Sequence, residues 1–100
     1  MERSIFLDQV FTPTDDVMFR RIADETLLVP VRRSTADLES VYRLNEVATR
    51  VWELLDGQRT GAAIGAVLAR EFEVTPEEAA ADVARFLERL AARGAVVARE

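Results

Sequence analysis

Few of the residue types that carry out chemistry in proteins occur in this sequence. Its 100 residues include no cysteine and no histidine, and all 13 basic residues are arginine. Disulfides, thiol nucleophiles, histidine-dependent triads, Schiff-base lysines and nearly every zinc, copper or haem site are therefore excluded. We expect a protein that is not an enzyme and that holds no cofactor and no metal.

Length and charge narrow the class further. With 100 residues, of which 49% are hydrophobic, the chain is expected to form one domain with its own core. The formal net charge of −5 argues against a general affinity for nucleic acid, because that affinity depends on neutralising phosphates. No apolar run approaches the ~20 residues that span a bilayer, and the N-terminus lacks a signal peptide's apolar stretch. We expect a cytoplasmic protein without a membrane partner.

The first 16 residues differ from the remainder. Apolar residues at positions 5–11 are followed by Pro13, Asp15 and Asp16, which break any regular pattern. We expect residues 1–16 to form an arm that packs onto the domain or onto a neighbouring subunit, and residues 17–100 to form the domain. Whether the chain is a monomer or a homodimer stays open.

Three short strands are expected next. Branched and aromatic apolar residues predict strands at residues 17–22, 26–31 and 40–44, separated by a three-residue turn and a charged loop at residues 32–39. Pro30 donates no hydrogen bond, so it should lie near a strand end or on an unpaired side. Strands that follow one another in this way indicate an antiparallel meander.

The second half of the chain is predicted to be helical. Asn45, Thr60 and Thr75 are N-cap residues, and Thr75 opens a capping box with Glu78 behind a proline at the first helical position. The first helix should end at Asp56–Gly57 and the third at Gly94. Residues 95–98 could form a short terminal strand or tuck under the helices. The core face of the third helix is expected to consist of Ala79, Val83, Phe86, Leu87 and Leu90.

Three strands followed by three helices make an α+β fold, similar to a winged helix-turn-helix: a three-stranded antiparallel sheet followed by a three-helix bundle. A winged-helix DNA-binding regulator is therefore one alternative. In such proteins the start of the second helix of the motif faces the bases. Here that segment begins Pro76-Glu77-Glu78, and its carboxylates would face a polyanion. The helix dipole alone accounts for these acidic residues.

The helical half resembles the PqqD-like family, whose founding member is a small chaperone of pyrroloquinoline quinone (PQQ) biosynthesis. The residues that carry the resemblance fall into two groups: Leu44-Asn45-Glu46, Val51-Trp52-Glu53-Leu54-Leu55-Asp56-Gly57 and Arg59-Thr60, and then Phe72, Val74, Pro76, Ala80, Asp82-Val83 and Phe86-Leu87. The resemblance covers about residues 17–97. It implies a non-catalytic recognition element for ribosomally synthesised, post-translationally modified peptides (RiPPs). Such an element binds the leader of a precursor peptide and presents it to a modifying enzyme, often a radical SAM protein. PQQ biosynthesis and another modified-peptide pathway both stay open, because an apolar N-terminal arm is unusual in the founding members.

In that family the leader adds as a strand beside the third strand and lies against the third helix. Strand addition suits an edge strand, whose backbone groups are unpaired on one side. Mapped onto this sequence, the expected leader-binding residues are Ser40, Val41, Tyr42, Arg43, Leu44, Asp82, Arg85, Phe86 and Arg89. Arg85 and Arg89 are one helical turn apart and could together hold a leader carboxylate, because the guanidinium fork suits bidentate pairing.

Each of these side chains has a plainer interpretation. Phe86 shares the apolar face of its helix and could be simply a core residue. Arg85 and Arg89 could be part of a solvated helix face with neighbouring charges. Alternation along the strand allows only one of two sets, Tyr42 or the pair Val41 and Arg43, to line the cleft.

Overall fold

The computed structural model describes residues 5–31 and 41–99. Its main sheet is an antiparallel meander of β2 (Val17–Ile22), β3 (Glu25–Pro30) and β4 (Tyr42–Leu44), in that spatial order. The turn between β2 and β3 contains Ala23 at a φ of 56°, the left-handed conformation typical of two-residue hairpin turns. β3 ends at Pro30, as expected of a residue that cannot donate to the ladder. The predicted meander is therefore confirmed.

Three longer helices follow the sheet: α2 (Glu46–Glu53), α3 (Gly61–Glu71) and α4 (Pro76–Ala92). Each begins at the predicted N-cap, where the side chain of Asn45, Thr60 or Thr75 accepts a hydrogen bond from the backbone N–H three residues on. The capping box of Thr75 and Glu78 is complete, and α4 ends next to Gly94, which has a φ of 75°. No helix in the described part of the chain is long and apolar enough to cross a membrane.

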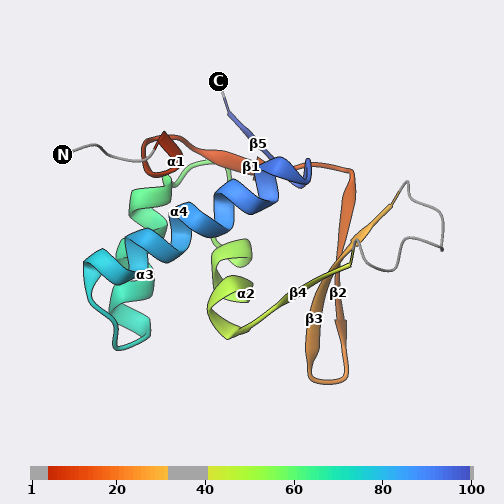
Figure 1. Ribbon diagram of the computed structural model, residues 1–100, viewed down its shortest axis with the longest axis horizontal. Helices are drawn as coiled ribbons and strands as arrows, with labels where there is room; N and C mark the ends of the chain where they lie inside the picture. The colour runs from red at the N-terminus through yellow and green to blue at the C-terminus, as the bar shows by residue number, and fades with distance from the viewer. Residues whose placement is uncertain (1–4, 32–40, 100) are drawn as a thin grey trace.

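The core lies where the helices meet one another and the inner face of the sheet. α4 contributes the five side chains that the sequence predicted, and all of them are buried: Ala79, Val83, Phe86, Leu87 and Leu90. The sheet contributes Leu28 and Leu44, and α2 contributes Val51. In Figure 1, α4 crosses in front of α3 and continues toward the sheet, so that it lies alongside β4.

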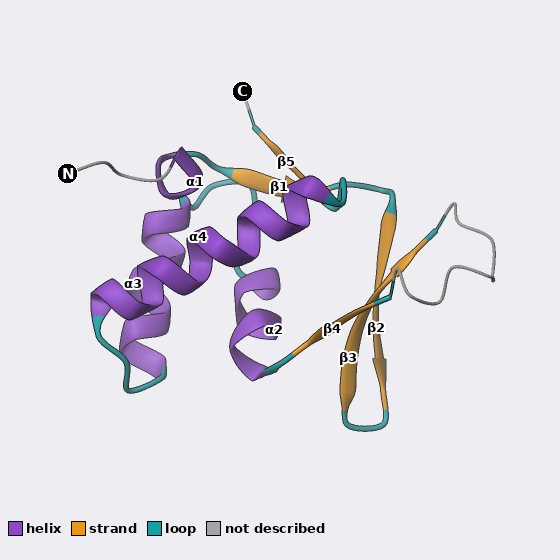
Figure 2. Ribbon diagram, in the orientation of Figure 1, coloured by secondary structure: helices purple, strands orange, loops and turns teal. Residues whose placement is uncertain are grey.

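The N-terminal segment packs onto this body. Its short helix α1 (Ile5–Asp8) lies against α3 and α4, and β1 (Phe11–Pro13) pairs antiparallel with β5 (Val96–Ala98). Figure 2 shows this second, two-stranded sheet at the edge of the helical layer, away from the hairpin of β2 and β3. Phe11 is buried and its ring stacks on that of Phe6. The sequence allowed this segment to pack onto the domain or onto a neighbouring subunit, and in the structure it packs onto the domain.

Several boundaries differ from the prediction. β3 spans Glu25–Pro30 and not residues 26–31, and the turn before it has two residues and not three, because Glu25 already pairs with Ile22 in the ladder. α2 ends at Glu53, so the expected end at Asp56–Gly57 is wrong. The carboxylate of Asp56 accepts hydrogen bonds from the N–H groups of Gln58 and Arg59, which starts a loop instead of continuing the helix. Gly57 does take a positive φ, but inside that loop. The third strand is also shorter than predicted: it begins at Tyr42, Val41 precedes it, and Ser40 lies outside the described residues.

Candidate functional site

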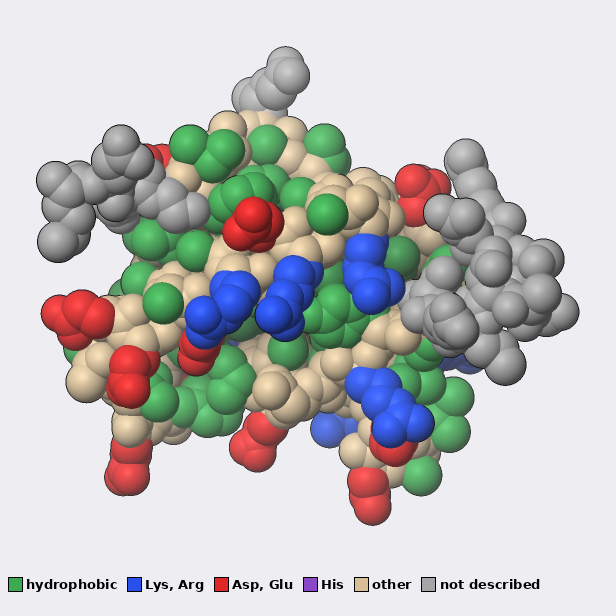
Figure 3. All heavy atoms as spheres, viewed as in Figure 1, with side chains coloured by type: hydrophobic (Ala, Val, Ile, Leu, Met, Phe, Trp, Pro, Cys, Tyr) green, Lys and Arg blue, Asp and Glu red, His purple; other side chains and the backbone are tan. Residues whose placement is uncertain are grey.

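A cleft of about 670 Å³ opens between β4, the start of α2 and α4. β4 supplies all three of its residues to the wall, and α4 supplies Asp82, Arg85, Phe86 and Arg89. A second hollow of about 500 Å³ continues beside β4, between residues 41–43 and the C-terminal end of α4. Together these two spaces form one groove between β4 and α4, which we call the β4–α4 groove. In Figure 3 the groove lies below a row of arginine side chains, with hydrophobic side chains at its base.

One side of the groove is formed by an edge strand. β4 pairs with β3 through the register Leu28–Tyr42, Leu27–Arg43 and Thr26–Leu44. Among the described strands it has no neighbour on its other side. An edge strand can accept an extended peptide through main-chain hydrogen bonds, so the position of β4 beside the groove provides the geometry for strand addition.

The base of the groove is apolar. Leu44 and Val51 are buried, and Phe86 is 8% exposed. The ring of Tyr42 meets the ring of Phe86 edge to face, with 5.9 Å between their centroids. Tyr42 and Leu44 therefore form the core side of β4, and Arg43 between them is exposed. The expectation that only one of the two sets lines the cleft is wrong: Tyr42 and Arg43 both line it, because the groove runs along the edge of β4 and side chains of either face border it. Phe86 combines the two roles that the sequence left open, because it belongs to the core and also lines the groove.

Charged side chains form the rim. On α4, a guanidinium nitrogen of Arg85 lies 2.5 Å from a carboxylate oxygen of Asp82, three residues earlier on the same exposed helix face. Arg89 is exposed and, within residues 5–31 and 41–99, has no ion-pair partner. On β4, Arg43 lies 3.8 Å from the carboxylate of Glu25, and both side chains are largely exposed. Of the two arginines expected to hold a carboxylate, Arg85 is thus already engaged and Arg89 is accessible.

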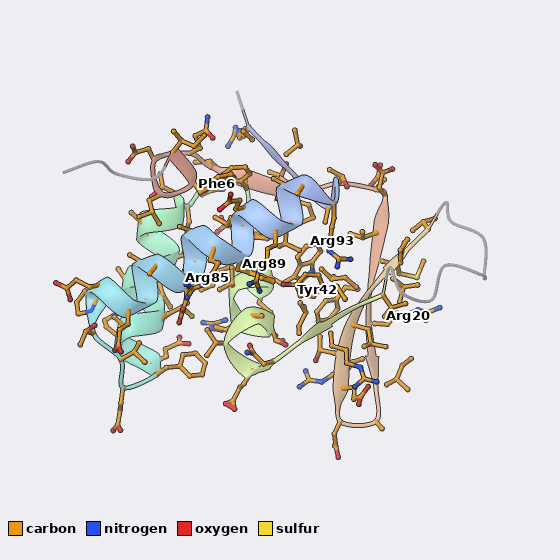
Figure 4. All side chains as sticks on the ribbon, in the orientation of Figure 1. Phe6, Arg20, Tyr42, Arg85, Arg89 and Arg93 are labelled. Atoms are coloured by element: carbon orange, nitrogen blue, oxygen red, sulfur yellow. The ribbon has the colours of Figure 1, made fainter. Side chains whose placement is uncertain are left out.

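Several residues that line the groove are absent from the set that the sequence predicts, and Arg93 is the one that adds a charge on the α4 side. Arg93 directly follows α4, and its guanidinium carbon lies 4.7 Å from the centroid of the Tyr42 ring, a cation–π geometry. Figure 4 shows Arg85, Arg89 and Arg93 in line along the same side of the helix, with Arg93 next to Tyr42. The sequence spacing indicates this arrangement, because Arg93 follows Arg89 by the same four residues that separate Arg89 from Arg85.

The structure thus brings most of the predicted site residues to one place. Seven of them line the main cleft: Tyr42, Arg43, Leu44, Asp82, Arg85, Phe86 and Arg89. Val41 lines the adjoining hollow. Ser40 lies outside the described residues, so the structure says nothing about its place.

A match to a protein-family model identifies the family of this chain. The family model of coenzyme PQQ synthesis protein D (PqqD) matches residues 25–96. This chain belongs to the PqqD family. The matched range runs from the start of β3 to the start of β5, and it includes every described residue of the β4–α4 groove except Asp24. The resemblance identified from residues 44–87 is therefore confirmed. No curated protein sequence matches the chain.

Solved structures with this PqqD-family fold are found among peptide-recognition proteins. TbiB1 in complex with the TbiA(beta) leader peptide is 25% identical, with a TM-score of 0.69 over 85% of this chain and 93% of that one. Two further structures are below 25% identity and show the fold. A lasso peptide synthetase B1 complexed with the leader peptide is 19% identical, with a TM-score of 0.73 over 88% and 98% of the two chains. The PqqD truncation of Methylobacterium extorquens PqqCD, described as a functional and stand-alone RiPP recognition element, is 22% identical, with a TM-score of 0.69 over 88% of each chain. None of these matches supports the DNA-binding alternative.

Proposed function

We propose that this PqqD-family chain is a RiPP recognition element that binds the leader of a ribosomally made precursor peptide as an added strand along β4. The observation that carries the proposal is the β4–α4 groove, where an edge strand borders a cleft of about 670 Å³. Similarity to TbiB1, whose structure holds a leader peptide, supports the same role.

Different parts of the groove supply affinity and specificity for a peptide. The backbone of β4 offers hydrogen bonds that any extended peptide can use, and these supply affinity. Side chains of the peptide then alternate between the groove and solvent, so every second one meets the apolar base and the charged rim. Tyr42, Leu44 and Phe86 suit apolar leader residues, whereas Arg89 suits a carboxylate.

The partner in this proposal is a modifying enzyme, and the recognition element itself is not catalytic. The sequence lacks cysteine, histidine and lysine, which matches a protein that presents a substrate to another active site. Membership of the PqqD family makes a radical SAM enzyme the first candidate, in PQQ biosynthesis or in the pathway of another modified peptide. Because ribosomes make the precursor, we place the encounter in the cytoplasm.

Fluorescence polarisation with a labelled leader tests this proposal. The probe is the N-terminal segment of the peptide that a short precursor gene next to the gene of this protein encodes. A scrambled peptide of the same composition is the control. We expect low-micromolar or tighter binding that scrambling abolishes, together with new hydrogen-exchange protection of the amides of β4. Equal binding of both peptides, or protection that avoids β4, would contradict strand addition in this groove.

A further inference from the structure

The β4–α4 groove is not uniformly charged along its length. The main cleft is lined by the carboxylates of Asp24, Glu25 and Asp82 as well as by arginines. The part of the adjoining hollow that residues 41–99 form has a different lining, with three arginines and no acidic residue: Val41, Tyr42, Arg43, Arg89, Ala92 and Arg93. Because β3 and β4 are antiparallel, Glu25 lies beyond the Leu44 end of β4. The groove therefore has a mixed end near Leu44 and a cationic end near Val41.

The arginines of the cationic end differ in how far they are already engaged. Arg43 has Glu25 at 3.8 Å, and Arg93 lies over the ring of Tyr42. A guanidinium carries five N–H donors, so an arginine that already has one partner can still donate to a second. Arg89 lines both parts of the groove and has no ion-pair partner among residues 5–31 and 41–99. Arg85 stands apart, since Asp82 neutralises it at 2.5 Å and it does not line the hollow.

The spacing of Arg89 and Arg93 fits the repeat of an extended peptide. Four residues of α-helix advance about 6 Å along the helix axis. Side chains on one face of a strand repeat every two residues, which is about 6.6–6.8 Å. α4 lies alongside β4 (Figure 1), so a peptide added to β4 would run beside α4. Two successive inward-facing residues of that peptide would then lie opposite Arg89 and Arg93. The small difference between the helical and the strand spacing is within the reach of flexible arginine side chains.

We propose that the cationic end of the groove selects a leader segment with two carboxylates separated by one residue, an acidic–any–acidic pattern. One carboxylate pairs with Arg89 and the other with Arg93, while the residue between them points to the other face of the added strand. The proposal rests on the proposed function, because it specifies which leaders the same groove accepts. Arg85, neutralised by Asp82, takes no part in this selection.

Selection from a random peptide library tests the pattern while the client peptide is still unidentified. The full chain is immobilised and used to select from an mRNA-displayed library of peptides of roughly twelve random residues. We expect enriched peptides to share acidic residues two positions apart, flanked by apolar residues that suit the base of the groove. Enriched peptides that compete for the groove but lack this spacing would overturn the pattern and leave the proposed function standing. Failure to enrich any peptide would overturn both.

A pair of isomeric peptides then assigns the pattern to its residues. One is a selected peptide, and the other has the same composition with its two acidic residues adjacent. For the wild type we expect the isomer to bind about tenfold more weakly, the loss of one charge-assisted hydrogen-bonded pair. In the double variant Arg89→Gln with Arg93→Gln the two peptides should bind within about twofold of each other.

Two control variants accompany this measurement. Arg20→Gln removes a charge from β2, and Figure 4 shows that Arg20 lies at the far side of the sheet from α4. Arg70→Gln removes an exposed charge from α3, and Arg70 lines neither part of the groove. Both controls should keep the tenfold preference. A preference that survives in the double variant, or that disappears in either control, would overturn the assignment to Arg89 and Arg93.

Discussion

The ring of Tyr42 meets the ring of Phe86 edge to face, with 5.9 Å between the two centroids. This contact joins the edge strand β4 to a residue of α4 that lies more than forty positions later in the chain. β4 has only three residues in the sheet, so its ladder with β3 is short. The aromatic pair therefore sets the distance between the two walls of the groove.

Replacement of Tyr42 should weaken both the fold and peptide binding. We expect Tyr42→Ala to lower the free energy of unfolding by about 1–2 kcal/mol, through loss of the aromatic pair and of the stacked Arg93 guanidinium. Tyr42→Phe keeps the ring and should remain within about 0.5 kcal/mol of the wild type. Urea denaturation gives the free energy of unfolding, and fluorescence polarisation with a bound leader gives the affinity. If Tyr42→Ala bound the leader like the wild type, the pair would not shape the groove.

Reversal of two charges on α4 should reduce the affinity for an acidic leader. Arg85→Glu with Arg89→Glu places carboxylates along the rim, and we expect at least about tenfold weaker binding because like charges then face each other. The matched control is Arg20→Glu with Arg21→Glu, which makes the same change of net charge on β2. Far-UV circular dichroism checks that both variants fold. Equal losses in the two double variants would mean that net charge, and not the groove, determines affinity.

The ion pair between Arg50 and Glu71 should make stability depend on pH in the acid range. The Arg50 guanidinium donates to both carboxylate oxygens of Glu71, at 2.8 and 2.9 Å, and joins α2 to α3. Hydrogen bonds from Arg50 hold the pKa of Glu71 below its ordinary value of 4.5. A lowered pKa in the folded state stabilises the fold above the ordinary value, and this contribution is lost as pH falls through the lowered one.

We therefore expect Glu71→Gln to unfold at a lower temperature than the wild type near neutral pH. The difference in Tm should narrow as the pH falls from about 7 to about 3, because the wild-type carboxylate is then protonated. Since both side chains are partly exposed, the effect should be modest and should decrease with added salt. A Tm difference that stayed constant over this pH range would exclude the ion pair as its cause.

Two glycines of α3 should respond in opposite ways to a methyl group. At Gly61 a Cβ would lie 2.2 Å from the backbone oxygen of Phe6, so Gly61→Ala must displace the N-terminal segment. We expect a loss of about 1–3 kcal/mol in stability. At Gly65 the nearest atom would be the Cα of Ala80 at 3.5 Å, an ordinary contact. Gly65→Ala should be neutral or stabilising by up to about 1 kcal/mol, since alanine favours the helix. Thermal unfolding of both variants distinguishes these outcomes.

The N-terminal segment should contribute to the stability of the domain. Phe11 is 4% exposed, stacks on Phe6 and belongs to β1, which pairs with β5. Phe11→Ala should cost about 3–5 kcal/mol, the usual range for removing a buried phenylalanine. Thr12→Ala, at the adjacent position of β1, is the control and should cost much less. If both variants unfolded like the wild type, the packing of this segment would be energetically unimportant.

Local features are the ones that the sequence predicts correctly. The caps at Asn45, Thr60 and Thr75 are confirmed because an N-cap depends on a side chain and a backbone N–H three residues away. The buried face of α4 is confirmed for a similar reason, because helical periodicity depends on residues that are only three or four positions apart in the chain. The predicted end of α2 is wrong because the hydrogen bonds of Asp56 compete with the helix, and propensity alone does not decide that competition.

The order of the three meander strands and the three longer helices follows from the amino-acid sequence, as do the N-caps, the apolar face of α4 and the lack of cysteine, histidine and lysine chemistry. Packing in three dimensions was needed to show that β1 pairs with β5 across more than eighty residues, and that Arg93 lies over Tyr42. It also showed that Asp82 neutralises Arg85 while Arg89 stays accessible. The physical reason is that pairing between distant segments depends on how packed elements approach one another, and no local pattern of residues encodes that distance.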